Sequence, residues 1–307
     1  MSVPRPRARV LGRVLQERAV VGAVMLVGTS LSIQVAAAIA HDLFDRVGPA
    51  GASAMRFALG AVILFAIVRP PIRGRDAATW GAIATYGVSL AALNLTFFQA
   101  ISLIPMGIAV TLSFIAPLVM ALVSSRRPRD IFWALLAGAG IATLGSVDPP
   151  GSVSGVLFAI GAGCAWIGVA YAGRSVGRRT RRVDGLALAI PIAALITAPL
   201  GIGLASEAVE MRSLAIGLVI AVGGLIIPIA LELEALRRLE PRMVAVIYSV
   251  DPAIAAVVGF LVLGEQLTAV QGVALVAVMI ASAGVTASAR DTEAPAAGAQ
   301  ASPNSVD

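Results

Sequence analysis

The sequence predicts an all-α integral membrane protein of ten transmembrane helices, arranged as two inverted repeats of five helices each. Hydrophobic residues make up 58% of the 307 residues and charged residues only 13%, whereas ordinary soluble domains carry about 25% charged residues. Apolar runs long enough to span a bilayer, about 20 residues each, recur along the chain. Two distant stretches, 100–125 and 228–265, also share one plan in which a proline interrupts an apolar run.

The expected spans leave a basic arm at residues 1–18 and a tail at residues 291–307. They cover residues 19–40, 50–68, 79–99, 105–124, 131–147, 153–173, 185–204, 213–233, 243–263 and 268–288. The first span resembles a secretory signal but is longer than the roughly 7–15 apolar residues of a cleaved one, so we interpret it as an uncleaved helix. The tail is rich in Ala, Pro and Ser, which predicts disorder.

The arginines predict the orientation of these spans. All 23 basic residues are arginine, and with a cytoplasmic N-terminus 20 of them fall in cytoplasmic segments. Only Arg46 and Arg212 lie outside, and Arg56 lies within a span. This satisfies the positive-inside rule and places both termini in the cytoplasm. A chain without lysine also lacks the P-loop lysine that holds ATP phosphates, and the distribution of charge does not favour nucleic acid as a partner.

The two repeats are expected at residues 19–147 and 153–288. A shift of 135 positions aligns Ala100 with Ala235 and the mid-span Pro117 with Pro252. Because five spans per half is an odd number, the second half enters the membrane in the opposite direction. Inverted repeats with interrupted helices are typical of transporters.

The two prolines predict helix kinks near the middle of the membrane. Proline in a helix removes a hydrogen bond and displaces the carbonyl four residues back. The carbonyls concerned belong to Ser113 and Tyr248. They are candidate substrate acceptors, unless the kinks at Pro117 and Pro252 only shape helix packing.

Acidic residues within the later spans are the strongest candidates for function, because a carboxylate in an apolar span is costly and rarely without a task. Asp251 is expected to carry the coupled proton or to bind a substrate ammonium. Glu232 is a second candidate for proton coupling. The alternative is that Glu232 and Glu234 reach water or pair with the nearby arginines of the link at 237–242. Glu265, at the outer end, is expected to be solvated.

Other polar residues within the spans are candidate substrate contacts. Arg56 could hold a carboxylate in a forked pair, or it could reach lipid headgroups or pair with Asp42 or Asp45. The uncharged candidates, which could equally form hydrogen bonds between helices, are Gln34, Asn94, Thr111 and Ser113. A single histidine cannot build a usual zinc site, so no metal or cofactor is expected, and no motif supports an enzyme.

Small residues four apart allow helices to approach closely in lipid. They occur at Gly155, Ala159 and Gly163, and again at Ala134, Gly138 and Ala142. They predict close packing within one bundle, with a homodimer interface as the alternative.

Several stretches in their order along the chain resemble the EamA group of the drug/metabolite transporter superfamily. They are Ser32-Ile33-Gln34, Arg56-Phe57-Ala58-Leu59-Gly60, Tyr86-Gly87-Val88-Ser89-Leu90, Pro105-Met106-Gly107-Ile108-Ala109-Val110, Ser124-Ser125-Arg126-Arg127-Pro128, Asp251-Pro252-Ala253 and Leu263-Gly264-Glu265-Gln266-Leu267-Thr268. The resemblance implies ten helices in two inverted repeats and a central cavity lined by helices three, four, eight and nine. It differs at Ser113 and Ala116, where a relative within the group carries glutamate and glycine.

The sequence and the resemblance together predict a bacterial inner-membrane exporter of small amino acids such as threonine or homoserine, driven by proton antiport. The expected partners are the small-molecule substrate, protons and the lipid bilayer. One alternative is the same fold exporting another metabolite or a drug. Another is a membrane enzyme or scaffold that transports nothing.

Overall fold

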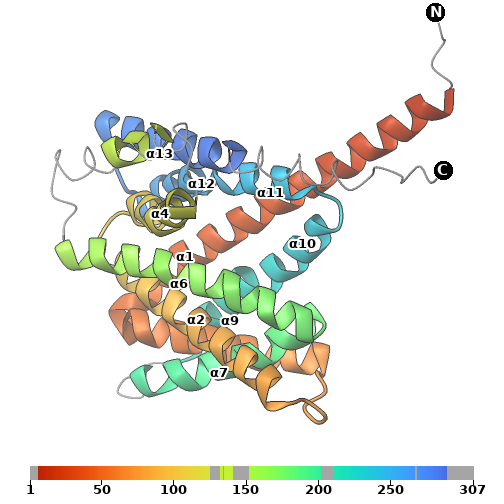
Figure 1. The fold of residues 1–307 in the computed structure, drawn as a ribbon. Coiled ribbons are helices and arrows are strands. Elements are labelled where there is room, and N and C mark those ends of the chain that lie inside the picture. The colour runs from red at the N-terminus through yellow and green to blue at the C-terminus, as the bar shows by residue number, and fades with distance from the viewer. Residues whose placement is uncertain are drawn as a thin grey trace, which may run out of the picture.

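The computed structural model describes residues 6–124, 132–133, 135–140, 152–201, 210–266 and 268–288, which are mostly helical and contain no β-strand (Figure 1). The helices are α1 (Pro6–Val68), α2 (Ala77–Ile101), α3 (Met106–Ser113), α4 (Ile115–Ser124), α6 (Val153–Arg179), α7 (Arg182–Gly201), α9 (Met211–Ala221), the π-helix η2 (Val222–Ile226), α10 (Ile227–Leu236), α11 (Pro241–Tyr248), α12 (Asp251–Val258), the π-helix η3 (Gly259–Leu263) and α13 (Ala269–Ser288). The predicted tail and most of the predicted span at 131–147 lie outside the described residues.

Six of the helices within the described residues are long and apolar enough to cross a membrane. They are Arg18–Val68, Ala77–Ile101, Val153–Arg179, Val183–Leu200, Met211–Leu236 and Val246–Leu263, and the shorter apolar helices are Met106–Met120 and Ala269–Gly284. The prediction of an all-α, multi-pass membrane protein is therefore confirmed at this level.

Helix α1 contains two predicted spans, which meet at a kink. Gly48 has φ 67° and ψ 167° and is followed by Pro49. A positive φ is easily adopted only by glycine, and proline has no N–H for the helical hydrogen bond. The chain therefore changes direction here, between the predicted spans 19–40 and 50–68.

The structure interrupts the chain just before each of the two mid-span prolines. α3 ends at Ser113 and α4 begins at Ile115, two residues before Pro117. α11 ends at Tyr248, and α12 begins one residue before Pro252. Each break leaves backbone groups outside the regular helical ladder at positions deep in the chain's apolar runs.

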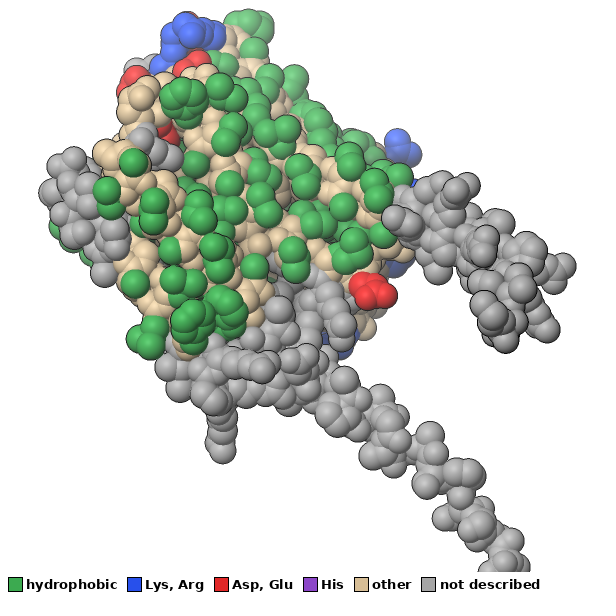
Figure 2. All heavy atoms as spheres, turned by 90° about the horizontal axis from the view of Figure 1, so that it is seen from above, with side chains coloured by type: hydrophobic (Ala, Val, Ile, Leu, Met, Phe, Trp, Pro, Cys, Tyr) green, Lys and Arg blue, Asp and Glu red, His purple; other side chains and the backbone are tan. Residues whose placement is uncertain are grey.

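The helices pack into a bundle with an apolar exterior. In Figure 1, α6 lies across the middle, with α2, α7 and α9 on one side and α4, α12 and α13 on the other. All eight residues of α3 are buried, and they contribute to the largest apolar cluster. Hydrophobic side chains cover much of the face drawn in Figure 2, whereas charged side chains lie toward its edges. Such a surface suits lipid, because the bilayer core does not solvate charge.

The small-residue stripe of α6 packs within this bundle. A Cβ atom on Gly155 would lie 2.7 Å from the Ile104 side chain, and one on Gly163 would lie 2.2 Å from the carbonyl oxygen of Ser113. Ala159 is fully buried. The stripe therefore brings α6 against the loop before α3 and against the last residue of α3, so these three residues pack within the bundle.

Candidate functional site

Asp251 lies at the start of α12, where the chain re-enters a helix after the break that follows Tyr248. The Ser30 hydroxyl of α1 donates a hydrogen bond to Asp251 Oδ1 at 2.5 Å. The carboxylate is thus held between the first helix and a helix more than 200 residues later. The hydroxyl fixes one carboxylate oxygen and leaves the other for a further partner.

Tyr248 and Glu232 extend this site toward α10. The Tyr248 phenol lies against the Glu232 carboxylate, with Asp251 also within electrostatic range. Glu232 and Asp251 interact with each other in turn. We call Ser30, Glu232, Tyr248 and Asp251 the acidic cluster. Two carboxylates within electrostatic range of each other in an apolar environment are easier to accommodate when one of them binds a cation or a proton.

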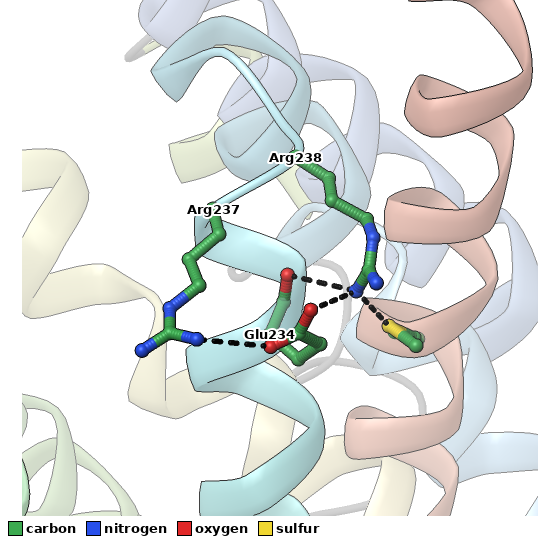
Figure 3. A network of polar contacts seen from close by, with 4 residues as sticks. Glu234, Arg237 and Arg238 are labelled. Atoms are coloured by element: carbon green, nitrogen blue, oxygen red, sulfur yellow. Dashed lines mark hydrogen bonds and ion pairs between the residues drawn. The ribbon is translucent and has the colours of Figure 1, made fainter. Parts of the chain in front are cut away.

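Glu234 does not belong to the acidic cluster, although it is only two residues from Glu232. It pairs with Arg237 at 3.4 Å and with Arg238 at 2.6 Å (Figure 3). Arg238 also contacts the sulfur of Met25. Of the two interpretations offered for these acids, pairing with the link arginines therefore holds for Glu234, whereas Glu232 faces the interior.

A cavity of about 320 Å³ opens beside the acidic cluster, and Glu232 forms part of its wall. Four helices line it: α2, α6, α7 and α10. Its lining includes Tyr86, Trp166, Gly173, Arg174, Glu232 and Leu236. We call it the α6–α10 cavity. Its volume lies at the lower end of the roughly 300–1,000 Å³ typical of small-molecule sites.

Arg56 lies in the interior and neither reaches toward headgroups nor forms an ion pair among the described residues. Its Nη2 donates to the carbonyl oxygen of Gly224 in η2. Its guanidinium lies 5.8 Å from the ring centroid of Phe98, a cation–π distance. Its Nε is buried without a hydrogen-bond partner in the described part of the chain. The expected pairing with Asp42 or Asp45 is therefore absent there, and one donor of Arg56 is still free.

The π-helix η2 supplies the acceptors for this part of the interior. Ser32 donates to the carbonyl oxygen of Gly223 at 2.6 Å, next to the Gly224 carbonyl that Arg56 uses. A π-turn disturbs the regular α-helical bonding and is often found at functional sites. Ser32, before the kink in α1, and Arg56, after it, thus each form a hydrogen bond to η2.

The uncharged candidates fall into two groups. Gln34 and Asn94 are buried, and Gln34 Oε1 and Asn94 Oδ1 have no hydrogen-bond partner among the described residues. Thr111 donates to the Gly107 carbonyl at 2.7 Å. The Ser113 hydroxyl lies 2.9 Å from the Ala109 carbonyl and 3.0 Å from that of Ala159. The two amides thus retain unpaired acceptors, whereas the hydroxyl hydrogens of Thr111 and Ser113 are engaged within the bundle.

Glu265 forms a structural contact that the sequence interpretation missed. It is half-buried rather than solvated, and its Oε1 and Oε2 accept from the Met106 backbone N–H at 2.9 and 3.0 Å. Met106 starts α3, whose N-cap Pro105 offers no side-chain bond. A carboxylate is favourable there because the first amides of a helix are unpaired and carry partial positive charge.

A glycine makes room for this contact. A Cβ atom on Gly259 would lie 2.2 Å from Glu265 Oε2, so a larger residue there would displace the carboxylate from its present position. Gly264, with φ 69°, reverses the chain between η3 and Glu265. The signal available in the sequence was the combination of these two glycines with an α3 start that lacks a capping side chain.

Replacing Glu265 with Gln is expected to flatten part of the pH dependence of stability. Burial raises the pKa of the Glu265 carboxyl, although the Met106 N–H and the charge of His41 oppose the shift. A raised folded-state pKa means that its stabilising contribution is present below the unfolded value, about 4.3, and is lost as pH rises through the folded value. The melting temperature in detergent, measured from pH 4 to 7, should fall more steeply for wild type than for Glu265→Gln.

The exposed Glu240 provides the matched control for this measurement. Glu240→Gln should reproduce the wild-type curve. Parallel curves for wild type and Glu265→Gln would show that the burial of Glu265 does not affect how the stability of the protein depends on pH.

An apolar helical bundle with a partly buried acidic cluster and a cavity beside it is the arrangement expected of a membrane transporter. Residues 153–287 match the EamA-like transporter family. The chain belongs to this family, because similar curated proteins cover most of its length. The class also fits the predicted absence of enzymatic chemistry, since the relatives are named as exporters.

Two of these relatives are threonine/homoserine exporters called RhtA. The protein of Escherichia coli (strain K12) is 39% identical over 272 residues, which cover 87% of this chain and 92% of that protein. The protein of Salmonella typhimurium (strain LT2) is also 39% identical over 272 residues, which cover 87% of this chain and 91% of the relative. A solved crystal structure matches 89% of this chain and 99% of its own at a TM-score of 0.58 and 18% identity, which shows a shared fold. The protein is therefore a multi-pass transporter of the inner membrane.

Proposed function

We propose that this protein exports small amino acids such as threonine or homoserine from the cytoplasm in exchange for protons. The observation that carries the proposal is the position of Asp251, whose carboxylate accepts a hydrogen bond from Ser30 of α1 within an apolar bundle, with Glu232 within electrostatic range. The relatives at 39% identity, named as threonine/homoserine exporters, support the substrate class. An ammonium group and a proton compete naturally for such carboxylates, and that competition is the basis of an exchange cycle.

The proposed cycle assigns a role to each group of polar residues. Asp251 alternates between a proton and the substrate ammonium, and Glu232 relays the proton past Tyr248. Arg56, through its free Nε, attracts the substrate carboxylate, while Gln34 and Asn94 accept from its ammonium or hydroxyl. Thr111 and Ser113 contribute through their backbone and through the packing of α3 rather than through their occupied hydroxyl donors. The breaks before Pro117 and Pro252 are the proposed points of bending.

The proposed topology is ten helices in two inverted repeats, residues 19–147 and 153–288, with the basic arm at 1–18, the tail at 291–307 and both termini in the cytoplasm. The arginine distribution supports it, as does the interruption of one helix in each half. A homodimer would have to use a surface other than the α6 stripe, because that stripe is occupied within the chain.

Single cysteines provide the test of orientation, in a background where the exposed Cys164 is replaced by alanine. A cysteine at Ser152, before α6, should react with an impermeant thiol reagent on intact cells. A cysteine at Thr180, after α6, should react only once the membrane is opened. The reverse pattern would place the termini outside and overturn the proposed orientation.

The test of function is the movement of labelled threonine across sealed proteoliposomes. In proteoliposomes that hold the protein inside-out, uptake of threonine should accelerate when the lumen is made more acidic than the outside, because protons then leave as threonine enters. A competition panel of amino acids, nucleosides and drugs would separate the amino-acid proposal from the same fold exporting another compound. If threonine does not move but a labelled compound of another class does, that class would replace small amino acids as the proposed substrate.

A further inference from the structure

The α6–α10 cavity lies toward one end of the bundle. It is lined by Arg174 and Gly177 near the end of α6, by Leu186 near the start of α7 and by Leu236 at the end of α10. These positions adjoin the turns at 180–181 and 237–240. In the proposed orientation this is the cytoplasmic end, from which an exporter must take its substrate.

The opposite end is joined by polar contacts between distant parts of the chain. Arg46 forms an ion pair with Glu210, and Glu265 accepts from Met106 at the start of α3. The cavity and the contacts thus lie at opposite ends of the bundle, as expected for a transporter that receives substrate from the cytoplasm.

Two side chains of opposite charge face this cavity from different helices. Arg174 belongs to α6 and Glu232 to α10. Neither takes part in an ion pair within the described ranges, in contrast to Glu234, which is paired with two arginines. Both charges are therefore available to a ligand that carries a positive and a negative group.

An α-amino acid at neutral pH is such a ligand, since it carries an ammonium and a carboxylate on one carbon. A guanidinium binds a carboxylate through two parallel hydrogen bonds, and charge-assisted bonds are about twice as strong as neutral ones. The cavity volume of about 320 Å³ leaves room for a small side chain beside Tyr86 and Trp166. Tyr86 and Trp166 form apolar walls beside the two charged side chains.

We propose that the α6–α10 cavity is a loading site for zwitterionic amino acids, in which Arg174 binds the carboxylate and Glu232 binds the ammonium. The inference rests on the proposed export of amino acids and adds the place where the substrate first binds. Glu232 also lies against Tyr248, close to Asp251. Glu232 therefore belongs both to the cavity wall and to the acidic cluster that contains Asp251.

Equilibrium binding to the purified full-length protein in nanodiscs tests this site. Labelled threonine is displaced by unlabelled threonine, by threoninamide, which lacks the carboxylate, and by 2,3-dihydroxybutyrate, which lacks the ammonium. Wild type should bind each analogue roughly 10-fold to 100-fold more weakly than threonine, the usual effect of losing one charged contact.

The variants assign each charge to its side chain. Arg174→Gln should weaken threonine by a similar factor but leave threoninamide unchanged, and that retained binding also shows that the variant is folded. Glu232→Gln should weaken threonine and threoninamide but leave 2,3-dihydroxybutyrate unchanged. Arg178→Gln, on the same helix but away from the cavity lining, is the matched control and should bind all three as wild type does.

The outcomes separate this inference from the proposed function. If wild type transports threonine and Arg174→Gln binds threonine with wild-type affinity, the loading site is wrong and amino-acid export stands. Equal weakening of all three ligands by Arg174→Gln would also overturn the site, because a general structural effect would explain it. If wild type neither binds nor transports threonine, the proposed function itself fails.

Discussion

Asp251→Asn is expected to abolish proton-driven export of threonine while the protein still reaches the membrane. Asparagine resembles the protonated acid in shape and can still accept the hydrogen bond from Ser30, but it cannot release a proton. One proton moving through 100 mV supplies roughly 2.3 kcal/mol, and each tenfold concentration step costs about 1.4 kcal/mol. Loss of coupling should therefore remove a substrate gradient of roughly 50-fold.

Proteoliposomes with and without a pH gradient, beside a measurement of protein level, give the readout. Because Asp251 also binds the substrate ammonium in the proposed cycle, threonine exchange down its own gradient should be lost in Asp251→Asn as well. Exchange that survives would restrict Asp251 to the proton. Asp45→Asn changes an exposed acid and is the matched control. A well-inserted Asp251→Asn protein with wild-type, gradient-dependent export would remove Asp251 from the mechanism.

Gly163→Ala is expected to be the most damaging single methyl addition among the α6 glycines. The new Cβ would lie 2.2 Å from the Ser113 carbonyl oxygen and 3.0 Å from its carbon. Both are backbone atoms, so no side chain can rotate away, and α6 and α3 must separate. Overpacking of this kind costs about 1–3 kcal/mol and occasionally more, and here it would also break the Ser113 bond to the Ala159 carbonyl.

Gly161 provides the comparison on the same helix. A Cβ there would meet only the Thr96 side chain at 3.6 Å, an ordinary contact, so Gly161→Ala should be close to neutral. The measurement is the yield of folded protein in detergent and its melting temperature. Similar melting temperatures for the two variants would show that α6 can shift away from α3 without cost.

The sequence predicted the helical membrane class because that class depends on composition, which needs no tertiary information. It also pointed to Asp251 and to the breaks near Pro117 and Pro252, because a charge or a proline in an apolar run conflicts with its surroundings. It could not say which of Glu232 and Glu234 faces inward. It also misplaced Glu265, because the partner of that carboxylate is a backbone amide 159 residues away.

For Ser113, the sequence could not distinguish between two possible partners of the hydroxyl. A hydroxyl in an apolar span can serve a substrate or a neighbouring helix, and only the distances to the Ala109 and Ala159 carbonyls distinguish the two. The partner of Arg56 could not be predicted either. Its acceptor is a carbonyl oxygen of the π-helix η2, and no periodicity in the sequence predicts that π-helix.

The same π-helix determines the direction in which the side chains of the following helix, α10, point. An α-helix turns by about 100° per residue, and the wider π-turn accommodates an extra residue. Glu232 lies six residues beyond the end of η2, so the direction of its side chain depends on how far the chain rotates through η2. If the same residues of Val222–Ile226 formed a regular α-helix instead, Glu232 would be rotated by about 100° away from Tyr248, although the composition of the span would be unchanged. The direction in which this acid points, toward the interior or toward lipid, thus depends on the π-turn.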